Sequence, residues 1–369
     1  MSSKPHTLRI LGIRGVPAAH GGFETFAEYL ALYLVRKGWK VTVYCQVDGK
    51  GPMYEDSWEG VHRVNIPIAN EGPAGTMLFD WISTRHAQKI GEPCLTLGYN
   101  TAVLCAFLRF SGVPNVINMD GIEWKRGKWG LAPKILFYLN EWAGAWLGDH
   151  LIADHPEIKA HLSRRTSSDR ITVIAYGAED IQRADVAPIE ALGLEPGRFL
   201  SVIARAEPEN SILEIVQGFT RKKRGMKLVI LGKYDDANPY HRAVKQAAND
   251  EVLFLGPIYD KKVVQVLRFY SAAYVHGHQV GGTNPSLVEA LGAGNAVIAH
   301  DNQFTRWVAG PEAAYFDGAD SFANQLDALL ADPARMDRMR EASRQRFQEA
   351  FRWESILGQY EQLLLKYQK

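Results

Sequence analysis

The most informative stretch of the chain is Tyr274-Val-His-Gly-His-Gln-Val-Gly-Gly-Thr-Asn-Pro-Ser-Leu-Val-Glu-Ala-Leu-Gly-Ala-Gly-Asn-Ala-Val-Ile-Ala-His300. Its first residues close a short apolar strand, and residues 276–284 are polar and contain glycine. A helix is expected from Pro285, because proline suits the first helical position. The start of a helix offers unpaired N–H groups and a partial positive charge, which suit a phosphate.

The same stretch contains candidate ligands for a nucleotide or a nucleotide-sugar. Gly281 and Gly282 allow a backbone to approach a ligand closely. Glu289 lies about one turn inside the helix, within reach of the hydroxyls of a sugar attached to the phosphate. A structural alternative is open, because Ser286 to Glu289 also spells a capping box, whose side chains satisfy the helix end and bind nothing.

Length and composition predict a two-domain globular enzyme. The 369 residues exceed the length at which one hydrophobic core stops growing, about 250 to 300 residues. Hydrophobic residues make up 46% and charged residues 22%, which argues against disorder. With 42 Lys and Arg against 41 Asp and Glu, the net charge of +1 would not attract nucleic acid. We therefore expect no nucleic-acid partner.

Cysteine usage and the absence of targeting signals predict a cytoplasmic protein. Cys45, Cys94 and Cys105 lie in apolar stretches without Cys-x-x-Cys spacing, which favours reduced core residues over a metal site or a disulfide. The first residues lead directly into a strand, without the basic and apolar regions of an export signal. No apolar run approaches about 18 residues, so any membrane contact is expected to be peripheral.

Apolar runs alternate with amphipathic runs, which predicts two Rossmann-like domains with parallel sheets, facing each other across a cleft. We expect an acceptor-binding domain over residues 1–184 and a nucleotide-sugar-binding domain over 185–350, with a linker at 184–196. Residues 351–369 should form a helix that packs back toward the first domain. The expected strands are 8–13, 40–46, 61–66, 94–97, 115–119 and 150–153, then 199–204, 227–231, 252–255, 272–275 and 296–299. Chemistry is expected at their carboxyl ends.

A glycine-bearing loop follows the first strand, in the sequence Gly12-Ile-Arg-Gly-Val-Pro-Ala-Ala-His-Gly-Gly-Phe-Glu24. The chain contains neither a Gly-x-Gly-x-x-Gly fingerprint nor a P-loop. Gly15, Gly21 and Gly22 allow the loop to close on a bulky ligand, while Arg14 and the following helix start could meet a diphosphate. Plain turn formation is the alternative role of these glycines.

A second loop follows a buried strand, in the sequence Asn118-Met-Asp-Gly-Ile-Glu-Trp-Lys-Arg-Gly-Lys-Trp129. Asp120 or Glu123 could take a proton from an acceptor hydroxyl or hold a sugar, and either could instead pair with Lys125 or Arg126. The aromatic and basic residues of the loop, with a tryptophan-rich helix at 131–147, suit an anionic membrane surface or a lipid-diphosphate acceptor. The residues assigned to acceptor or membrane are Glu123, Trp124, Lys125, Arg126, Lys128 and Trp129. Core packing is the commoner fate of Trp142 and Trp146.

Two basic residues follow strands in the second half of the chain. Arg205 is placed to reach across the cleft as a bidentate phosphate ligand. Lys233 has the equivalent position one strand later. The basic run at 221–224 is expected to be a solvated helix end that the helix dipole favours.

Together these motifs resemble GT-B glycosyltransferases of the family 4 type. Gly12 to Pro17, Gly21 to Thr25, Met119 to Arg126 and Gly281 to Ala290 resemble the bacterial rhamnosyltransferase branch, and the likeness spans nearly the whole chain. The resemblance implies that a sugar moves, with retained anomeric configuration, from a nucleotide-sugar to an acceptor, with no cofactor and no required metal. It favours dTDP-rhamnose as the donor. The acceptor would be a lipid-linked sugar or a growing surface oligosaccharide or polysaccharide, near the cytoplasmic face of the inner membrane.

The resemblance also assigns roles to residues. It implies that Glu289 binds the donor ribose, that Asn284 and Ser286 lie near the phosphates, and that Asp120 faces the reacting sugar. The expected catalytic residues are Asp120, Arg205 and Glu289. The expected donor-binding residues are Gly15, Gly21, Gly22, Arg205, Lys233, His276, Gly282, Thr283, Asn284, Ser286 and Glu289. His276 and His278 could equally be structural histidines.

Two departures from the family pattern concern the diphosphate. Gly281 stands where the first member of the family's usual Glu-x7-Glu pair would be. The residues after Arg205 are acidic or neutral, whereas the family commonly has a lysine there. We therefore expect Arg205, the amides of residues 283–286, and Arg14 or Lys233 to bind the diphosphate.

Two other functions remain open on the sequence. A nucleotide-sugar epimerase can share the fold, but it does not need the aromatic and basic loop at 124–129. A two-lobed sugar-binding protein without catalysis is the second alternative, and the lack of an export signal counts against it.

Overall fold

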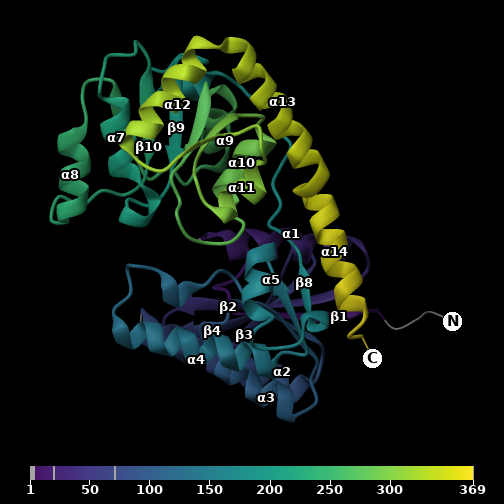
Figure 1. Cartoon of the computed structure of the whole chain (residues 1–369). Coiled ribbons are helices and arrows are strands. Elements are labelled where there is room, and N and C mark those ends of the chain that lie inside the picture. Colours follow the sequence, from purple (N-terminus) through teal and green to yellow (C-terminus); the bar gives the residue numbers. More distant parts are fainter. Residues whose placement is uncertain (1–4, 20, 70–71, 369) are drawn as a thin grey trace. The chain divides into compact units, whose positions relative to one another are not determined.

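The computed structural model describes residues 5–19, 21–69 and 72–368. The chain divides into two compact units (Figure 1). The first comprises Met1–Lys125, Trp129–Ala175 and Trp353–Lys369, and the second comprises Arg126–Lys128 and Tyr176–Arg352. Residues 1–4 and 369, with which the expected first domain begins and the expected last helix ends, lie outside the described residues.

The first unit is built on an eight-stranded sheet in the order β3-β4-β2-β1-β5-β6-β7-β8, in which all neighbours are parallel except β3 and β4. Most of these strands are apolar and buried, as their sequences predict. The strands are β1 (Thr7–Leu11), β2 (Lys40–Asp48), β3 (Tyr54–Trp58), β4 (Val61–Ile68), β5 (Cys94–Leu97), β6 (Asn115–Asn118), β7 (His150–Ala153) and β8 (Ile171–Val173).

The antiparallel edge strand β3 corrects the expectation of a purely parallel sheet. It joins β4 through a turn at Glu59 and Gly60, both of which have positive φ, at 49° and 83°. Positive φ at both turn residues is the conformation that suits a two-residue hairpin. Most of β3 is polar and exposed, so it lacks the apolar pattern from which the other strands were predicted.

Helices cover this sheet, and the last of them comes from the end of the chain (Figure 1). Tyr33 and Trp39 both donate hydrogen bonds to Glu361 on this last helix, at 2.8 and 3.2 Å. The predicted return of the terminal helix to the first unit is therefore confirmed. The helical segments are α1 (Gly22–Arg36), α2 (Pro73–Ile90), η1 (Ala102–Cys105), α3 (Ala106–Phe110), η2 (Glu123–Lys125), α4 (Leu131–Leu147), α5 (Pro156–Leu162), η3 (Ser168–Arg170) and α14 (Trp353–Leu365).

The second unit has a six-stranded sheet in the order β11-β10-β9-β12-β13-β14, with every pair of neighbours parallel. Leu200 and Val202 of β9 belong to one hydrophobic cluster, whereas Phe199 belongs to another. Because successive side chains point to opposite faces, the sheet is buried on both sides. The strands are β9 (Phe199–Ile203), β10 (Lys227–Leu231), β11 (Val252–Gly256), β12 (Ala273–His276), β13 (Ala296–His300) and β14 (Ala314–Phe316).

The segment expected to be a linker is instead part of the second unit. Ile189 and Leu194 are buried and pack in the same cluster as Phe199 and Leu267. These apolar side chains anchor residues 184–196 to one face of the sheet. The helical segments of this unit are α6 (Ala187–Glu190), η4 (Pro208–Asn210), α7 (Ile212–Phe219), α8 (Pro239–Ala247), α9 (Lys261–Tyr270), α10 (Pro285–Gly292), α11 (Gln303–Ala309), α12 (Ala319–Ala331) and α13 (Pro333–Ala350).

Each sheet has a point at which the order of its strands reverses. In the first unit β1 lies between β2 and β5, and in the second β9 lies between β10 and β12. In open parallel sheets, ligands bind outside the carboxyl ends of the strands at such a point. The loops after β1 and β9 are therefore the places where the fold favours a ligand.

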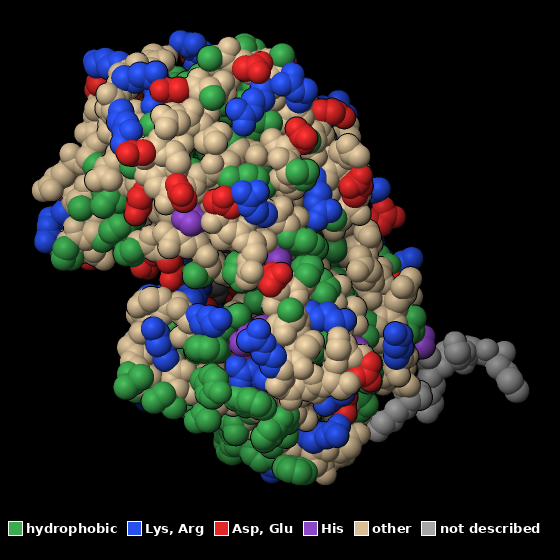
Figure 2. Space-filling model, in the orientation of Figure 1, with side chains coloured by type: hydrophobic (Ala, Val, Ile, Leu, Met, Phe, Trp, Pro, Cys, Tyr) green, Lys and Arg blue, Asp and Glu red, His purple; other side chains and the backbone are tan. Residues whose placement is uncertain are grey.

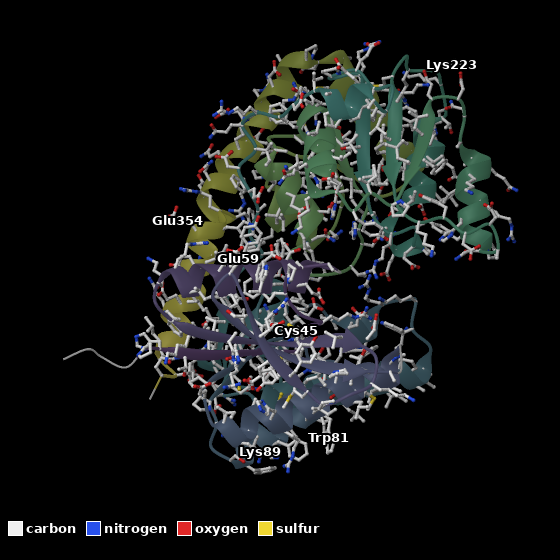
Figure 3. All side chains as sticks on the ribbon, turned by 180° about the vertical axis from the view of Figure 1, so that it is seen from behind. Cys45, Glu59, Trp81, Lys89, Lys223 and Glu354 are labelled. Atoms are coloured by element: carbon white, nitrogen blue, oxygen red, sulfur yellow. The ribbon has the colours of Figure 1, made fainter. Side chains whose placement is uncertain are left out.

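Two further expectations concern the core and the membrane. Cys45, Cys94 and Cys105 are free and buried, which confirms their prediction as core residues, and Figure 3 shows Cys45 inside the first unit. Among the described helices, none is both long and apolar enough to cross a membrane.

Candidate active site

The start of α10 is capped by Asn284. Its side-chain oxygen accepts a hydrogen bond from the N–H of Ser286 at 3.0 Å, and the helix begins at Pro285, as predicted. The Ser286 hydroxyl contacts the Tyr274 hydroxyl at 2.6 Å, so Ser286 and Glu289 do not form the capping box that was the alternative. Pro285 has no N–H and Ser286 donates its N–H to Asn284, so neither of these residues of the expected set 283–286 offers a free amide to an anion.

Glu289 pairs with Arg268 of α9, whose guanidinium lies 2.6 Å from its carboxylate. The Arg268 side chain is only 6% exposed and also donates to the Ser286 hydroxyl at 3.1 Å, whereas the Glu289 side chain is 35% exposed. The buried cation thus orients a carboxylate that remains accessible to a ligand. The sequence reasoning missed Arg268, although an arginine within the apolar run Val266 to Tyr270 was a signal.

A small pocket lies between the end of β12 and the starts of α10 and α11. It is lined by His276, His278, Gly282, Asn284 and Thr305, together with Val280, Leu287, Phe304 and Val308. The structure therefore brings together three of the predicted donor-binding residues, His276, Gly282 and Asn284. Thr283, between the last two, is buried.

Burial disfavours the charged form of the two histidines of this pocket. Their rings stack with centroids 4.3 Å apart, and burial lowers the pKa of His276 well below its usual value and that of His278 to about 3. Within the described part of the chain, neither ring nitrogen of the buried His276 has a hydrogen-bond partner. Such unpaired polar atoms cost free energy when buried, and a ligand in the pocket could pair with them.

Two predicted cations lie at the same edge of the sheet as this pocket. Arg205 follows β9 and Lys233 follows β10, and both are exposed. Because β9 lies between β10 and β12 and all three are parallel, their carboxyl ends adjoin. Arg205, Lys233 and His276 therefore gather where the strand order reverses.

Gly281 has a φ of 133°, a backbone conformation that other residues rarely adopt. A Cβ atom at this position would meet no atom within 4 Å, so lack of space does not explain the glycine. The backbone here takes a path that the glutamate usual in the family would not follow without strain.

In the first unit, two glycines of the loop after β1 are required by close packing. A Cβ atom on Gly12 would lie 2.3 Å from the carbonyl oxygen of Leu97, and one on Gly15 would lie 2.8 Å from the Sγ atom of Cys45. Both glycines also have positive φ, so the structural alternative accounts for Gly15. Gly21 directly precedes α1, which begins at Gly22, and Arg14 is exposed.

Asp120 lies just beyond the carboxyl end of β6 and has a φ of 53°, in the left-handed region. Its N–H donates to the side-chain oxygen of Asn118 at 3.0 Å. The Asn118 side chain in turn donates to the Tyr360 hydroxyl of α14 at 2.8 Å. The terminal helix thereby holds the turn that presents Asp120.

The loop predicted to meet acceptor or membrane is bound into the protein at several points. The indole N–H of Trp129 donates to Glu123, and that of Trp124 donates to Glu141, both at 2.9 Å. Lys125 and Lys128 are exposed. Arg126, which groups with the second unit, pairs with Glu209 at 2.6 Å.

One expectation about exposed and buried residues is wrong, and a second holds for three of the four residues of the basic run, Arg221, Lys222 and Lys223. Trp146 is 63% exposed instead of packing in the core. In the basic run, the Arg224 side chain is buried, donates to the carbonyl oxygen of Phe219 at 3.1 Å and pairs with Asp327, so it closes the end of α7. Lys223 is solvated as predicted and labelled in Figure 3 at the edge of the second unit.

Comparisons with known proteins agree with this architecture. Residues 6–179 match a domain of unknown function, DUF1972, and residues 190–346 match the family described as Glycosyl transferases group 1. No curated protein matches the chain by sequence. The carboxyl-terminal match defines the chain as a glycosyltransferase.

Solved structures share the whole fold at low sequence identity. A sucrose-phosphate synthase from Thermosynechococcus elongatus has a TM-score of 0.84 and 20% identity, over 98% of both chains. The Anabaena protein HepE, in complex with UDP, has a TM-score of 0.75 and 13% identity, over 98% of this chain and 100% of its own. An α,α-trehalose-phosphate synthase from Burkholderia xenovorans has a TM-score of 0.73 and 10% identity, over the same shares. The two Rossmann-like units thus have the GT-B architecture.

Proposed function

We propose that this glycosyltransferase transfers rhamnose from dTDP-rhamnose to a lipid-linked or polysaccharide acceptor in surface-glycan synthesis, with retained anomeric configuration and without a metal. The site in the second unit binds the donor, and the first unit binds the acceptor at the cytoplasmic face of the membrane. The choice of rhamnose is supported by the likeness of the motifs at 12–25, 119–126 and 281–290 to the rhamnosyltransferase branch.

One observation carries this proposal. Arg205, the pocket of His276 and the Glu289 carboxylate held by Arg268 all adjoin the point in the second sheet where ligands of open parallel sheets bind. A cation for phosphate and an accessible carboxylate for hydroxyls are the groups that a nucleoside diphosphate requires. Structures of the similar Anabaena protein contain UDP and UDP-glucose, which supports a donor of this chemical class.

The chemistry follows from the charges at the site. Breaking the bond between sugar and phosphate leaves negative charge on the diphosphate, and fixed donors aimed there lower the barrier. Arg205, Lys233 and the partial positive charge at the start of α10 supply this stabilisation. Glu289 accepts hydrogen bonds from the donor ribose. Asp120 of the first unit holds the acceptor or the reacting sugar, or takes the acceptor's proton.

The donor assignment can be tested by thermal stabilisation with a panel of nucleoside diphosphates. A bound ligand at 100 times its dissociation constant adds about 2.7 kcal/mol to the free energy of unfolding. We expect dTDP to stabilise the wild type and the control Lys223→Ala, and to stabilise Arg205→Ala much less. Equal stabilisation of all three proteins would remove Arg205 from the donor site.

Incubation with labelled dTDP-rhamnose separates the proposal from its two rivals. A transferase releases dTDP only when acceptor is present. An epimerase converts the sugar of the donor without acceptor, and a sugar-binding protein releases no dTDP under either condition.

A further inference from the structure

Helix α4 of the first unit has its apolar residues outside and its polar residues inside. Leu131, Leu139 and Trp146 are 77, 58 and 63% exposed, whereas Asn140 and Glu141 are buried. Since successive helical residues are about 100° apart, the three exposed residues fall within an arc of about 80°. A helix that faces water shows the opposite pattern.

The buried polar residues show that this orientation is specific. Glu141 accepts hydrogen bonds from Trp124 at 2.9 Å and from His161 at 2.7 Å, and pairs with Arg165. Asn140 accepts a hydrogen bond from the N–H of Val103 at 3.0 Å. Turning α4 to hide its apolar residues would break these bonds, so the protein holds its apolar side outward.

Neighbouring helices extend the exposed apolar area. Met77 and Trp81 of α2 and Phe110 of α3 are exposed, and η1 packs against both α2 and α4. In Figure 2, hydrophobic side chains form a broad area over these helices. We define the apolar face as Met77, Trp81, Phe110, Leu131, Leu139 and Trp146. Contiguous apolar areas of this kind mark interaction surfaces, whereas single exposed apolar residues do not.

The charges around this face indicate what covers it. The acidic residues of α2, α3 and α4 are Asp80 and Glu141, and both are buried. The basic residues of the same helices include Lys89 and Arg109. Both are exposed, although Arg109 pairs with Asp149, and Figure 3 shows Lys89 near Trp81 at one edge of the first unit. An apolar area that has an exposed lysine beside it, and whose own helices expose no carboxylate, complements an anionic lipid surface.

We infer that this apolar face docks on an anionic phospholipid bilayer, with α4 lying in the interface. A second copy of this chain is a less favourable occupant of the apolar face. In a symmetric dimer the same patch would face itself, so basic residues would lie opposite basic residues. The inference rests on the proposed function for its context and deepens the membrane location proposed there. It keeps the helix at 131–147 that the sequence suggested and adds α2 and α3, whereas the tryptophans of the loop at 123–129 are hydrogen-bonded within the fold.

The test is flotation of the full chain with vesicles of phosphatidylcholine alone or mixed with phosphatidylglycerol. We expect binding to the mixed vesicles, weaker binding to phosphatidylcholine, and a loss of binding as salt rises. Leu131→Glu combined with Leu139→Glu should lower partitioning at least about tenfold. The control Leu365→Glu changes an exposed leucine of α14 in the same unit and should bind like the wild type.

A second variant and two further measurements keep the outcomes distinct. Lys89→Glu tests the charge without touching the apolar residues and should weaken binding to mixed vesicles only. Thermal unfolding and stabilisation by dTDP should be unchanged in all of these variants, so a loss of vesicle binding would not be due to misfolding. The vesicle result would stand whether or not dTDP binds to the second unit. The inference is overturned if wild type and the double variant bind vesicles equally, if neither binds, or if the wild type is a dimer that the double variant dissociates.

Discussion

At the scale of single residues, Glu289 and Arg268 form an ion pair, and we propose that donor binding depends on it. Glu289→Gln keeps the shape of the side chain but removes its charge. Loss of a hydrogen bond to a charged group costs about 1.5–3 kcal/mol, so we expect donor affinity to fall at least about tenfold. Calorimetric titration with dTDP measures this.

The matched control for this substitution is Glu312→Gln, an exposed glutamate of the same unit. It should bind dTDP like the wild type. If Glu289→Gln also binds like the wild type, then Glu289 is only the structural partner of Arg268.

Gly281 provides a second prediction at this scale. Because its φ is 133°, introducing the glutamate usual in the family should destabilise the fold by about 1–3 kcal/mol and should not tighten dTDP binding. Urea unfolding measures the first effect. Gly127→Ala, at an exposed glycine without positive φ, is the control, and a Gly281→Glu protein as stable as the wild type would show that the backbone there is relaxed.

At the residue scale, the parts of the site that follow from local pattern could be predicted. Local pattern places Arg205 and His276 at strand ends and predicts the start of α10, because strand ends and helix starts are encoded in neighbouring residues. Arg268 could not be assigned to Glu289 in this way, because their contact depends on how α9 packs against α10. The same holds for the orientation of Trp146.

At the scale of elements, helix α2 carries a buried titratable group. Burial raises the pKa of Asp80 to about 6, while a hydrogen bond from Thr101 opposes this shift. The folded state therefore favours the protonated acid, and the stability that Asp80 contributes is present below pH about 4 and is lost as pH rises through about 6.

Asp80→Asn removes this dependence. Its free energy of unfolding, relative to the wild type, should increase by about 2–3 kcal/mol between pH 4 and pH 7. Urea unfolding of both proteins at the two pH values measures the difference. A constant difference would mean that Asp80 titrates normally.

Helix α14 is expected to act on the site through Asn118. Tyr360→Phe removes the hydroxyl that accepts the hydrogen bond of Asn118, and thereby loosens the turn at Asp120. We expect kcat to fall severalfold while KM for the donor is unchanged, since the donor site lies in the other unit. Steady-state kinetics at saturating acceptor measure both constants.

Tyr33→Phe is the matched control, because Tyr33 also bonds to α14 but does so through Glu361. The Tyr33→Phe protein should lose a similar hydrogen bond with little change in kcat. Equal effects of the two substitutions would mean that α14 contributes stability alone.

Elements with strong apolar patterns were predictable from sequence, and those without them were not. β5, β7 and β10 have the predicted bounds because each is a short apolar run. β3 is polar and β14 has only three residues, so both were missed. Their positions depend on pairing with β4 and β13, which a local pattern does not encode.

At the scale of the whole molecule, two Rossmann-like units with separate sheets divide the proposed work between donor and acceptor. The alternation of apolar and amphipathic runs predicted this architecture. The segment at 184–196 was expected to be a linker because its pattern is weak, yet Ile189 and Leu194 bury it in the second unit. Few apolar residues suffice to anchor a segment of irregular sequence.

The most direct test of the proposed function is NMR spectroscopy of the reaction with dTDP-rhamnose and a lipid-linked acceptor. We expect dTDP to appear only with acceptor present, and the new glycosidic bond to have the anomeric configuration of the donor. Inverted configuration, conversion of the donor without acceptor, or no turnover with any nucleotide-sugar would contradict it.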